Sequence, residues 1–243
     1  MRIEFSIFAR KFYMKKLIFF ILFICITITS KAQINEIGIF AGGSNYIGDI
    51  GSEYYINPNN FMGGIIYKYN FNPRMALRGT FTYAELSADD ANANNSARQQ
   101  RGLRFTNSVK ELAVGLEYNY FDFNIDTHNQ THTPYILVEI AAFNHNVVAE
   151  NNSSQPYEYD SKTTLAIPFG IGYKFKISRS LAMAIEVRAT YTFTDEIDYN
   201  FYEEIDPIPE LEFGNPNSND WYVLSGISIV YAFGRPPCYA TPY

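Results

Sequence analysis

Hydrophobic and polar residues alternate along most of the chain after residue 32. In the stretch from Leu181 to Phe193 every second residue is apolar, and the positions between them hold small, polar or charged side chains, among them Glu186 and Arg188. The stretch from Trp221 to Phe233 repeats this design. Because successive side chains of a β-strand point to opposite faces, a period of two predicts strands, each with one apolar face.

The alternation recurs often enough to predict eight strands. The two stretches named above are longer than the roughly 9 to 11 residues that a tilted strand needs to cross a bilayer. One predicted strand contains Tyr135 to Val138, which is apolar at all four positions. The eight strands are expected near residues 34–44, 61–71, 74–86, 106–121, 134–147, 163–176, 179–194 and 220–233.

The connections between these strands alternate in length. Short ones fall at 72–73 and 178–180, with a middling one at 124–133, whereas long polar ones span 45–60, 87–105, 148–162 and 195–219. Outer-membrane barrels have short periplasmic turns and long outer loops. The sequence therefore predicts an all-β fold, an eight-stranded antiparallel up-and-down transmembrane β-barrel over residues 33–233, in contact with outer-membrane lipid, with periplasmic termini and extracellular long loops.

The face opposite the apolar one carries charges of both signs, interleaved with glycine and alanine. Small and charged side chains together suit a narrow interior packed with ion pairs, whereas a soluble, lipocalin-like barrel would place its charges outside. An interior of eight strands is just wide enough for side chains to fill, which disfavours a diffusion pore. The predicted interior charges are Glu36, Lys68, Arg78, Glu111, Glu117, Lys174, Glu186 and Arg188, with Glu139 as a further candidate.

Aromatic residues are abundant, with 20 Tyr and 20 Phe against a single Trp. Many of them fall near the predicted strand ends on the apolar face. Membrane barrels place girdles of aromatic side chains at the two membrane–water interfaces, which would explain the excess. The alternative is a secreted soluble protein with an aromatic sandwich core.

The N-terminus has the pattern of a signal peptide. Lys15 and Lys16 precede an apolar run over residues 17–28, and Ser30-Lys31-Ala32 places small residues where a signal peptidase reads them. We expect cleavage after Ala32, and Met14 is an alternative start of translation. An uncleaved anchor is disfavoured, because the run is shorter than the roughly 20 residues of a spanning helix.

Charge and residue chemistry exclude several functions. Without residues 1–32 the chain keeps 13 of 19 Lys and Arg and 24 of 25 Asp and Glu, a net charge of −11, so no nucleic-acid partner is expected. His128 and His132 lie four apart without a third ligand, and the acidic stretch 195–210 lacks the spacing of a calcium loop. No Ser and His pair supports catalysis. We therefore expect no metal, no cofactor and no enzyme activity.

The segment from Glu36 to Gly51, Glu-Ile-Gly-Ile-Phe-Ala-Gly-Gly-Ser-Asn-Tyr-Ile-Gly-Asp-Ile-Gly, resembles the opening of a family of small outer-membrane proteins from Bacteroidota. That family includes PorG-type proteins of the type IX secretion system. The resemblance implies an outer-membrane barrel that associates with a periplasmic ring built of a lipoprotein and its soluble partner. Tyr231 and Phe233 resemble the C-terminal signal of such barrels, but here a tail over residues 234–243 follows.

The expected function is therefore a non-enzymatic component that anchors or organises the type IX protein secretion complex. Its expected periplasmic contact is the tail, with Arg235, Cys238 and Tyr239 as candidate residues. Once the signal peptide is removed, Cys238 is the one cysteine left, either an incidental free thiol or a partner in an intermolecular bond. The alternative is a stand-alone barrel acting as a narrow channel or as a surface adhesin.

Overall fold

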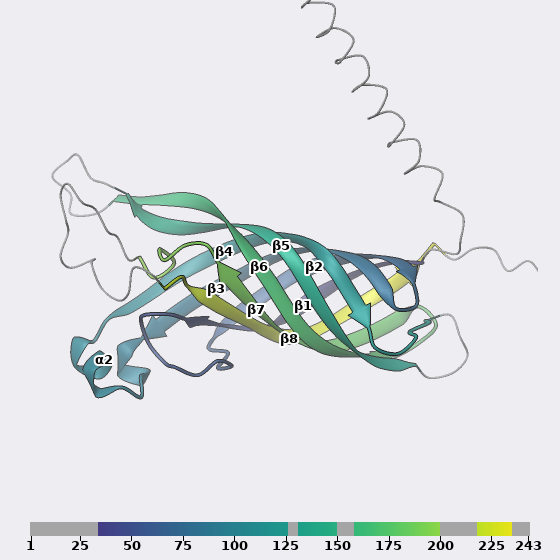
Figure 1. Cartoon of the computed structure of the whole chain (residues 1–243), viewed down its shortest axis with the longest axis horizontal. Helices are drawn as coiled ribbons and strands as arrows, with labels where there is room; N and C mark the ends of the chain where they lie inside the picture. The colour runs from purple at the N-terminus through teal and green to yellow at the C-terminus, as the bar shows by residue number, and fades with distance from the viewer. Residues whose placement is uncertain (1–33, 126–130, 150–157, 200–217, 235–243) are drawn as a thin grey trace, which may run out of the picture. The chain divides into compact units, whose positions relative to one another are not determined.

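The computed structural model describes residues 34–125, 131–149, 158–199 and 218–234 (Figure 1). Eight antiparallel strands form a closed barrel, in which each strand pairs with its neighbour in sequence and the last pairs with the first. All eight predicted strands are confirmed. They are β1 (Ile34–Ile47), β2 (Asn60–Asn72), β3 (Met75–Asp89), β4 (Arg104–Asn119), β5 (His132–Ala149), β6 (Glu158–Lys176), β7 (Leu181–Thr192) and β8 (Trp221–Phe233).

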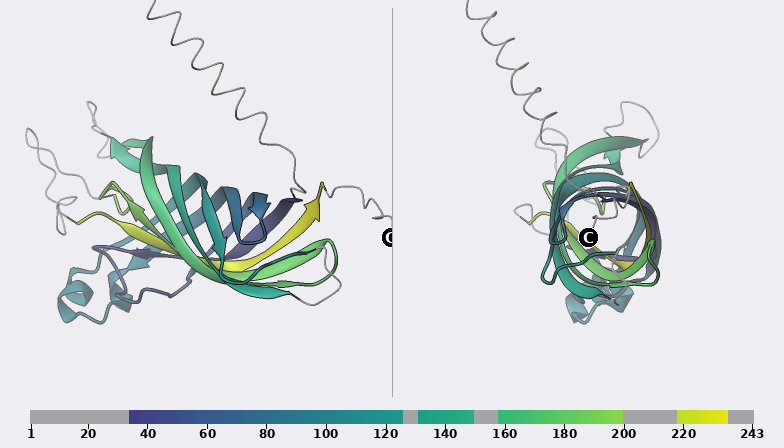
Figure 2. Two further views of the ribbon diagram at one scale, coloured as in Figure 1. Left: turned by 45° about the vertical axis from the view of Figure 1, so that its right-hand side comes forward. Right: turned by 90° about the vertical axis from the view of Figure 1, so that its right-hand side faces the viewer.

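Closure of the barrel depends on the pairing of β1 with β8, which extends from Asn35 opposite Phe233 to Ile47 opposite Trp221. The right-hand view of Figure 2 looks along the barrel and shows the strands joined in a ring. The start of β1 and the end of β8 therefore meet at one mouth, here called the turn end, together with the connections 73–74, 120–131 and 177–180. At the opposite mouth, the loop end, β1, β3, β5 and β7 end and β2, β4, β6 and β8 begin; the described connections there are 48–59, 90–103 and the parts 193–199 and 218–220 of the β7–β8 connection.

Several strands extend beyond their predicted ends at the loop end. The β5–β6 ladder continues from His145 opposite Lys162 to Ala149 opposite Glu158, through residues expected to form a loop. Likewise β1 continues to Ile47. The backbone ladder needs only paired N–H and C=O groups, so it can continue where apolar alternation has ended. The prediction from alternation alone was therefore wrong about these ends.

The connection between β3 and β4 contains two short helices that the sequence did not predict. These are η1 (Asp90–Asn92) and α2 (Ser96–Arg101). The Asn95 side chain accepts a hydrogen bond from the Ala97 N–H, and Gly102 ends α2 with a φ of 70°, which glycine adopts without strain. Among the described residues, no helix is long and apolar enough to cross a membrane.

The outer wall of the barrel is apolar on every strand. Aliphatic side chains occupy its middle and are exposed, for example Ile39 at 62% and Ile171 at 66%. Aromatic side chains gather toward both ends and contact one another, as in the pairs Tyr120–Phe121 and Tyr191–Trp221. Such a wall would be costly in water, and its aliphatic belt between aromatic girdles is the pattern of a lipid-facing surface.

The predicted signal peptide and nearly all of the predicted tail lie outside the described residues. Arg235, Cys238 and Tyr239 fall there, as do His128 and the acidic stretch beyond Tyr199.

Candidate functional site in the barrel interior

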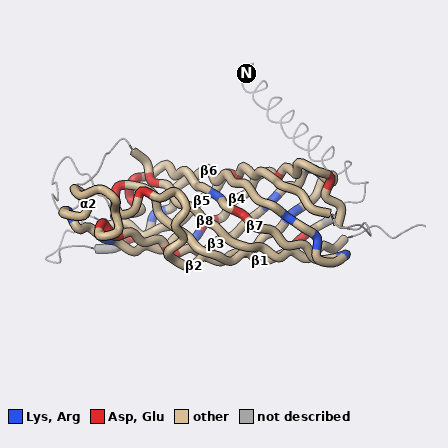
Figure 3. The backbone as a smooth tube through the Cα atoms, turned by 90° about the horizontal axis from the view of Figure 1, so that it is seen from below, with Lys and Arg blue, Asp and Glu red and all other residues tan. Residues whose placement is uncertain are grey.

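The barrel interior is filled along its length by three layers of side chains. Apolar residues occupy the loop-end half, charged residues occupy the half toward the turn end, and a second, smaller apolar cluster closes the turn end. Figure 3 shows the Lys and Arg segments in blue and the Asp and Glu segments in red along the barrel.

The structure places all eight predicted interior charges inside the barrel. Glu36, Lys68, Arg78, Glu111, Glu117, Lys174, Glu186 and Arg188 are each at most 3% exposed, and so is Glu139. All of them occupy inward-facing positions of their strands. For example, Lys68 of β2 lies opposite Glu36 of β1 and opposite Arg78 of β3. Alternation therefore accounts for their burial, and their pairing depends on the barrel geometry.

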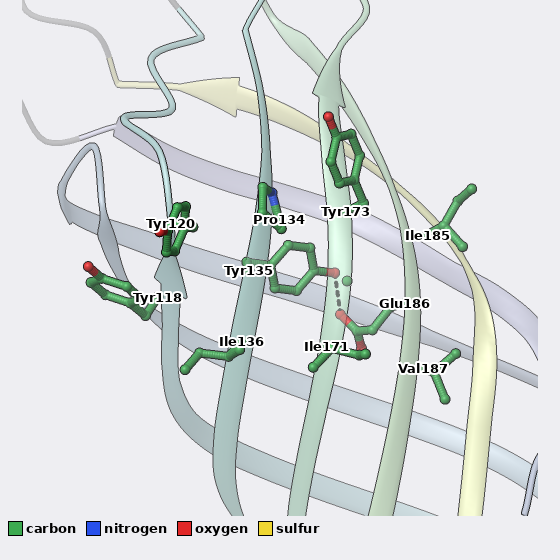
Figure 4. A pocket seen from close by; sticks show the side chains of 11 residues that line it. Tyr118, Tyr120, Pro134, Tyr135, Ile136, Ile171, Tyr173, Ile185, Glu186 and Val187 are labelled. Carbon is green, nitrogen blue, oxygen red and sulfur yellow. Dashed lines mark hydrogen bonds between the residues drawn. The ribbon is translucent and has the colours of Figure 1, made fainter.

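Arg78 lies at the centre of the charged layer. Its Nη1 and Nη2 donate to the Glu186 carboxylate across the barrel at 2.5 and 2.9 Å, a bidentate pair. The Tyr135 hydroxyl donates to the same carboxylate at 2.6 Å. Figure 4 shows the Tyr135 ring reaching toward Glu186. A Cβ atom at Gly172 would clash with the Tyr135 ring, so Tyr135 needs glycine at that position.

Glu117 joins the charged layer nearer the turn end. Lys68 Nζ and Lys174 Nζ each lie 2.6 Å from one of its two oxygens, and Arg78 Nη1 lies 3.5 Å from it. Three cations thus surround one carboxylate. These contacts offset part of the cost of burying the four charged groups.

Arg188 joins the layer nearer the loop end. Its Nη2 lies 2.8 Å from Glu111 and its Nη1 lies 3.0 Å from Glu139. The Tyr222 hydroxyl donates to the second oxygen of Glu111. Glu139 also lies 3.8 Å from Arg78 Nε, so it links the two arginines and makes the layer one continuous network.

The network is close to balanced in charge. Five carboxylates, Glu36, Glu111, Glu117, Glu139 and Glu186, face four cations, Lys68, Arg78, Lys174 and Arg188, all at most 3% exposed. Glu36 Oε1 accepts from the Asn70 amide at 2.9 Å, whereas its Oε2 has no hydrogen-bond partner among the described residues. A buried charge without a partner costs several kcal/mol, so near-balance is required for such an interior.

Several members of the network were not predicted as site residues. Tyr135, Tyr222 and the hydroxyls of Thr80 and Thr82 all donate to or accept from its charged groups. The alternation predicts that Tyr222, Thr80 and Thr82 face inward. It does not predict their contacts, because each contact joins strands that are far apart in the sequence. Residues 135–138 are apolar at every position, so their sequence did not show which of them face the interior. In the structure Tyr135 and Leu137 face inward, and Ile136 and Val138 face outward.

The loop end is closed by apolar side chains and by a folded part of the β7–β8 connection. Ile197 is fully buried in the apolar cluster, and its N–H donates to Asp220 at 3.0 Å. The Tyr46 hydroxyl lies within hydrogen-bond distance of both Asp198 and Asp220. Burial, together with the neighbouring carboxylates of Asp198 and Asp195, raises the pKa of Asp220 well above its usual range.

The turn end is closed by the β4–β5 connection. Phe123 and Ile125 are buried against Ala182, Val230 and Ala232 inside the barrel mouth. The Phe123 N–H donates to the Pro73 carbonyl at 3.1 Å, and Lys174 Nζ lies 4.8 Å from the Phe123 ring. The charged network is therefore covered at both ends.

Among the described residues, no three His, Cys, Asp or Glu side chains are grouped so that they could hold a metal ion. The buried carboxylates are instead neutralised by Lys and Arg. The chemistry of this interior is structural, because its cations and carboxylates bind one another.

The outer wall near the turn end holds an apolar groove of about 600 Å³ across β4 to β7 (Figure 4). The small Pro134 lies between the larger outward side chains of Tyr120 and Tyr173 and forms part of the groove lining. Every outward side chain that lines the groove belongs to the apolar outer wall described above.

A family model described as "Domain of unknown function (DUF6089)" matches residues 15–242. No curated protein matches the chain in sequence. Among solved structures, it is similar to a major outer membrane protein of Thermus thermophilus, with 13% identity, a TM-score of 0.48, and coverage of 84% of this chain and 100% of the other.

Two further solved structures are similar at the same level. One is Ail, the attachment invasion locus protein of Yersinia pestis, in complex with the heparin analogue sucrose octasulfate, with 12% identity, a TM-score of 0.46, and coverage of 84% and 100%. The other is the N-terminal β-barrel domain of Pseudomonas aeruginosa OprF, with 10% identity, a TM-score of 0.44, and coverage of 84% and 98%.

Proposed function

The chain belongs to the family described as a domain of unknown function (DUF6089), and we propose that the protein is a sealed, non-enzymatic β-barrel anchor of the outer membrane. In this proposal the wall of the barrel holds the protein in lipid. The two ends of the barrel then present surfaces to partners on either side of the membrane.

The observation that carries the proposal is the packing of the interior. Arg78 and Arg188 span the lumen to Glu186, Glu111 and Glu139, and both arginine side chains are fully buried, so side chains fill the lumen where these residues lie. A porin keeps its interior wet, whereas a filled small barrel provides a rigid membrane anchor. The apolar outer wall supports the membrane location.

We further propose that the barrel anchors or organises a type IX secretion complex. Support comes from the resemblance of residues 36–51 to PorG-type barrels, a segment that forms most of β1 and the start of the β1–β2 connection. The proposed partners are a lipoprotein and its soluble partner in a periplasmic ring. Their contact surface would be the turn end and the tail with Arg235, Cys238 and Tyr239.

Affinity purification of the full-length tagged protein from gently solubilised outer membranes, followed by mass spectrometry, tests this proposal. Recovery of the two ring components is the expected result. A second strain lacks residues 235–243, and its barrel is first verified as folded by its heat-dependent mobility on a gel. Loss of ring components from that strain supports contact through the tail, whereas recovery of the barrel alone from the intact strain contradicts the secretion role.

A surface adhesin is a second candidate, favoured by the folded β3–β4 connection. Asp90 is fully buried and accepts hydrogen bonds from Arg101, from the Gly51 N–H and from the Leu103 N–H. These bonds lower the pKa of Asp90, although burial alone would raise it. These contacts hold the β3–β4 connection in one conformation, which suits binding of a surface ligand. Replacing residues 93–101 by a Gly-Ser linker should abolish cell attachment if this candidate is correct.

A further inference from the structure

The β1–β2 connection folds against the outer wall at the loop end. The Asn45 side chain faces outward from β1; it donates to the Tyr55 carbonyl at 3.2 Å and accepts from the Asn57 N–H at 3.2 Å. Gly43, on the same outward face, has no side chain, and a Cβ there would clash with Pro58. These contacts hold the connection beside the wall and leave Tyr54, Tyr55 and Ile56 exposed.

A groove of about 760 Å³ lies between this connection and the wall formed by β6, β7 and β8. Its apolar side includes Ile56, Phe169, Val187 and Trp221. Phe169 and Trp221 contact each other edge to face, with ring centroids 5.9 Å apart. This side of the groove is continuous with the apolar belt, and Trp221 is at the level where an aromatic girdle meets water.

The polar side of the groove includes a cation. Arg98 of α2 donates from Nη1 to the Gly51 carbonyl at 3.1 Å and from Nη2 to the Gly48 carbonyl at 3.2 Å. Among the ion pairs of the described residues, none involves Arg98. The described hydrogen bonds of the guanidinium go to backbone carbonyls, so they leave its positive charge in the groove.

Asp49 also lines the groove and would disfavour an anion there. Asp49 also lies near Arg101: the hydrogen bond that Arg101 donates to Asp90 is the largest cause that raises the pKa of Arg101, and the charge of Asp49 adds to it. The Arg101 Nη2 also donates to the Asp49 carbonyl at 2.7 Å.

We propose that this groove binds a lipid with an anionic phosphate head group. The acyl part would lie against Phe169, Val187 and Trp221, and the phosphate would lie at Arg98. A phospholipid combines an apolar part with an anionic part, as the groove combines an apolar side with a basic side chain, and a basic side chain near the membrane surface attracts anionic lipid. The inference rests on the proposed membrane location of the barrel.

Trp221 is the single tryptophan of the chain, so its fluorescence reports directly on the groove. The full-length protein is reconstituted in phosphatidylcholine vesicles that contain a small share of phosphatidylglycerol brominated on its acyl chains. A second preparation contains the same share of brominated phosphatidylcholine. Bromine quenches tryptophan at short range, so the ratio of quenching in the two preparations measures enrichment of the anionic lipid at Trp221.

The expected enrichment is about fivefold, the value that corresponds to one basic side chain near a membrane surface. Arg98→Gln should reduce the ratio to near unity, whereas Arg98→Lys, which keeps the charge but changes the contacts to the loop carbonyls, should retain most of it. Arg104→Gln removes an exposed cation outside this groove and is the matched control, which should leave the ratio unchanged.

Equal quenching by the two brominated lipids would overturn the lipid site while leaving the membrane location intact. Retention of the full ratio in Arg98→Gln would overturn the role of Arg98 and with it the site. Absence of quenching by either lipid would instead contradict the proposed membrane location itself. The quenching experiment therefore distinguishes a failure of the lipid site from a failure of the proposed membrane location.

Discussion

Replacing Arg188 by leucine should destabilise the barrel strongly. The substitution removes the partner that lies 2.8 Å from Glu111 and 3.0 Å from Glu139. Among the ion pairs of the described residues, the one other cation at either carboxylate is Arg78, whose Nε lies 3.8 Å from Glu139. Breaking a buried pair by removing one partner costs about 3 to 5 kcal/mol, because the charge that remains is uncompensated. We expect a loss of that size for Arg188→Leu.

Urea unfolding of the refolded full-length protein in detergent micelles measures this loss as a fall in the midpoint at constant slope. The double variant Arg188→Leu/Glu111→Gln removes one charge of each sign and should recover part of the loss. Arg74→Leu breaks an ion pair with Asp122 in which both side chains are more than half exposed, and it is the control that should leave the midpoint unchanged. An unchanged midpoint in Arg188→Leu would refute the idea that the network is structurally coupled.

Two further predictions concern other parts of the interior. Gly172→Val should displace the Tyr135 ring from its bond to Glu186 and cost about 1 to 3 kcal/mol by overpacking, seen as a lower urea midpoint; an unchanged midpoint would contradict the described contact. The raised pKa of Asp220 means that its proton stabilises the folded loop end, so stability should fall as pH rises from the ordinary value of 3.8 through the folded value. Asp220→Asn should remove that slope in thermal unfolding across the pH range, and an identical slope in both proteins would contradict the assignment.

Alternation alone was sufficient to predict the barrel and the inward position of its charges. A period of two fixes which face each residue occupies, and closure follows from the need to leave no free strand edge in lipid. The same rule separated Tyr135 and Leu137 from Ile136 and Val138 once the register was known. The face that each residue occupies depends on its position along its own strand, so it can be predicted from a single sequence.

The pairing of the charges was not predictable in the same way. Arg78 and Glu186 are 108 residues apart and meet across the lumen, so their contact depends on strand tilt and stagger. The closing residues Phe123 and Ile125 lie in a connection whose sequence is mostly polar and irregular. The fold of the β1–β2 connection on the outer wall depends on Asn45 and Gly43, whose outward positions carry no signal of a contact with a loop.

Single-channel recording in a planar lipid bilayer tests most directly whether the barrel interior is sealed. The full-length protein is inserted from the vesicles in which lipid quenching of Trp221 has verified a membrane location. We expect no step conductance, because Arg78, Arg188 and their carboxylate partners fill the lumen and both mouths are covered by apolar side chains. Reproducible conductance steps that change amplitude in Arg188→Leu would contradict it and would make the barrel a narrow channel.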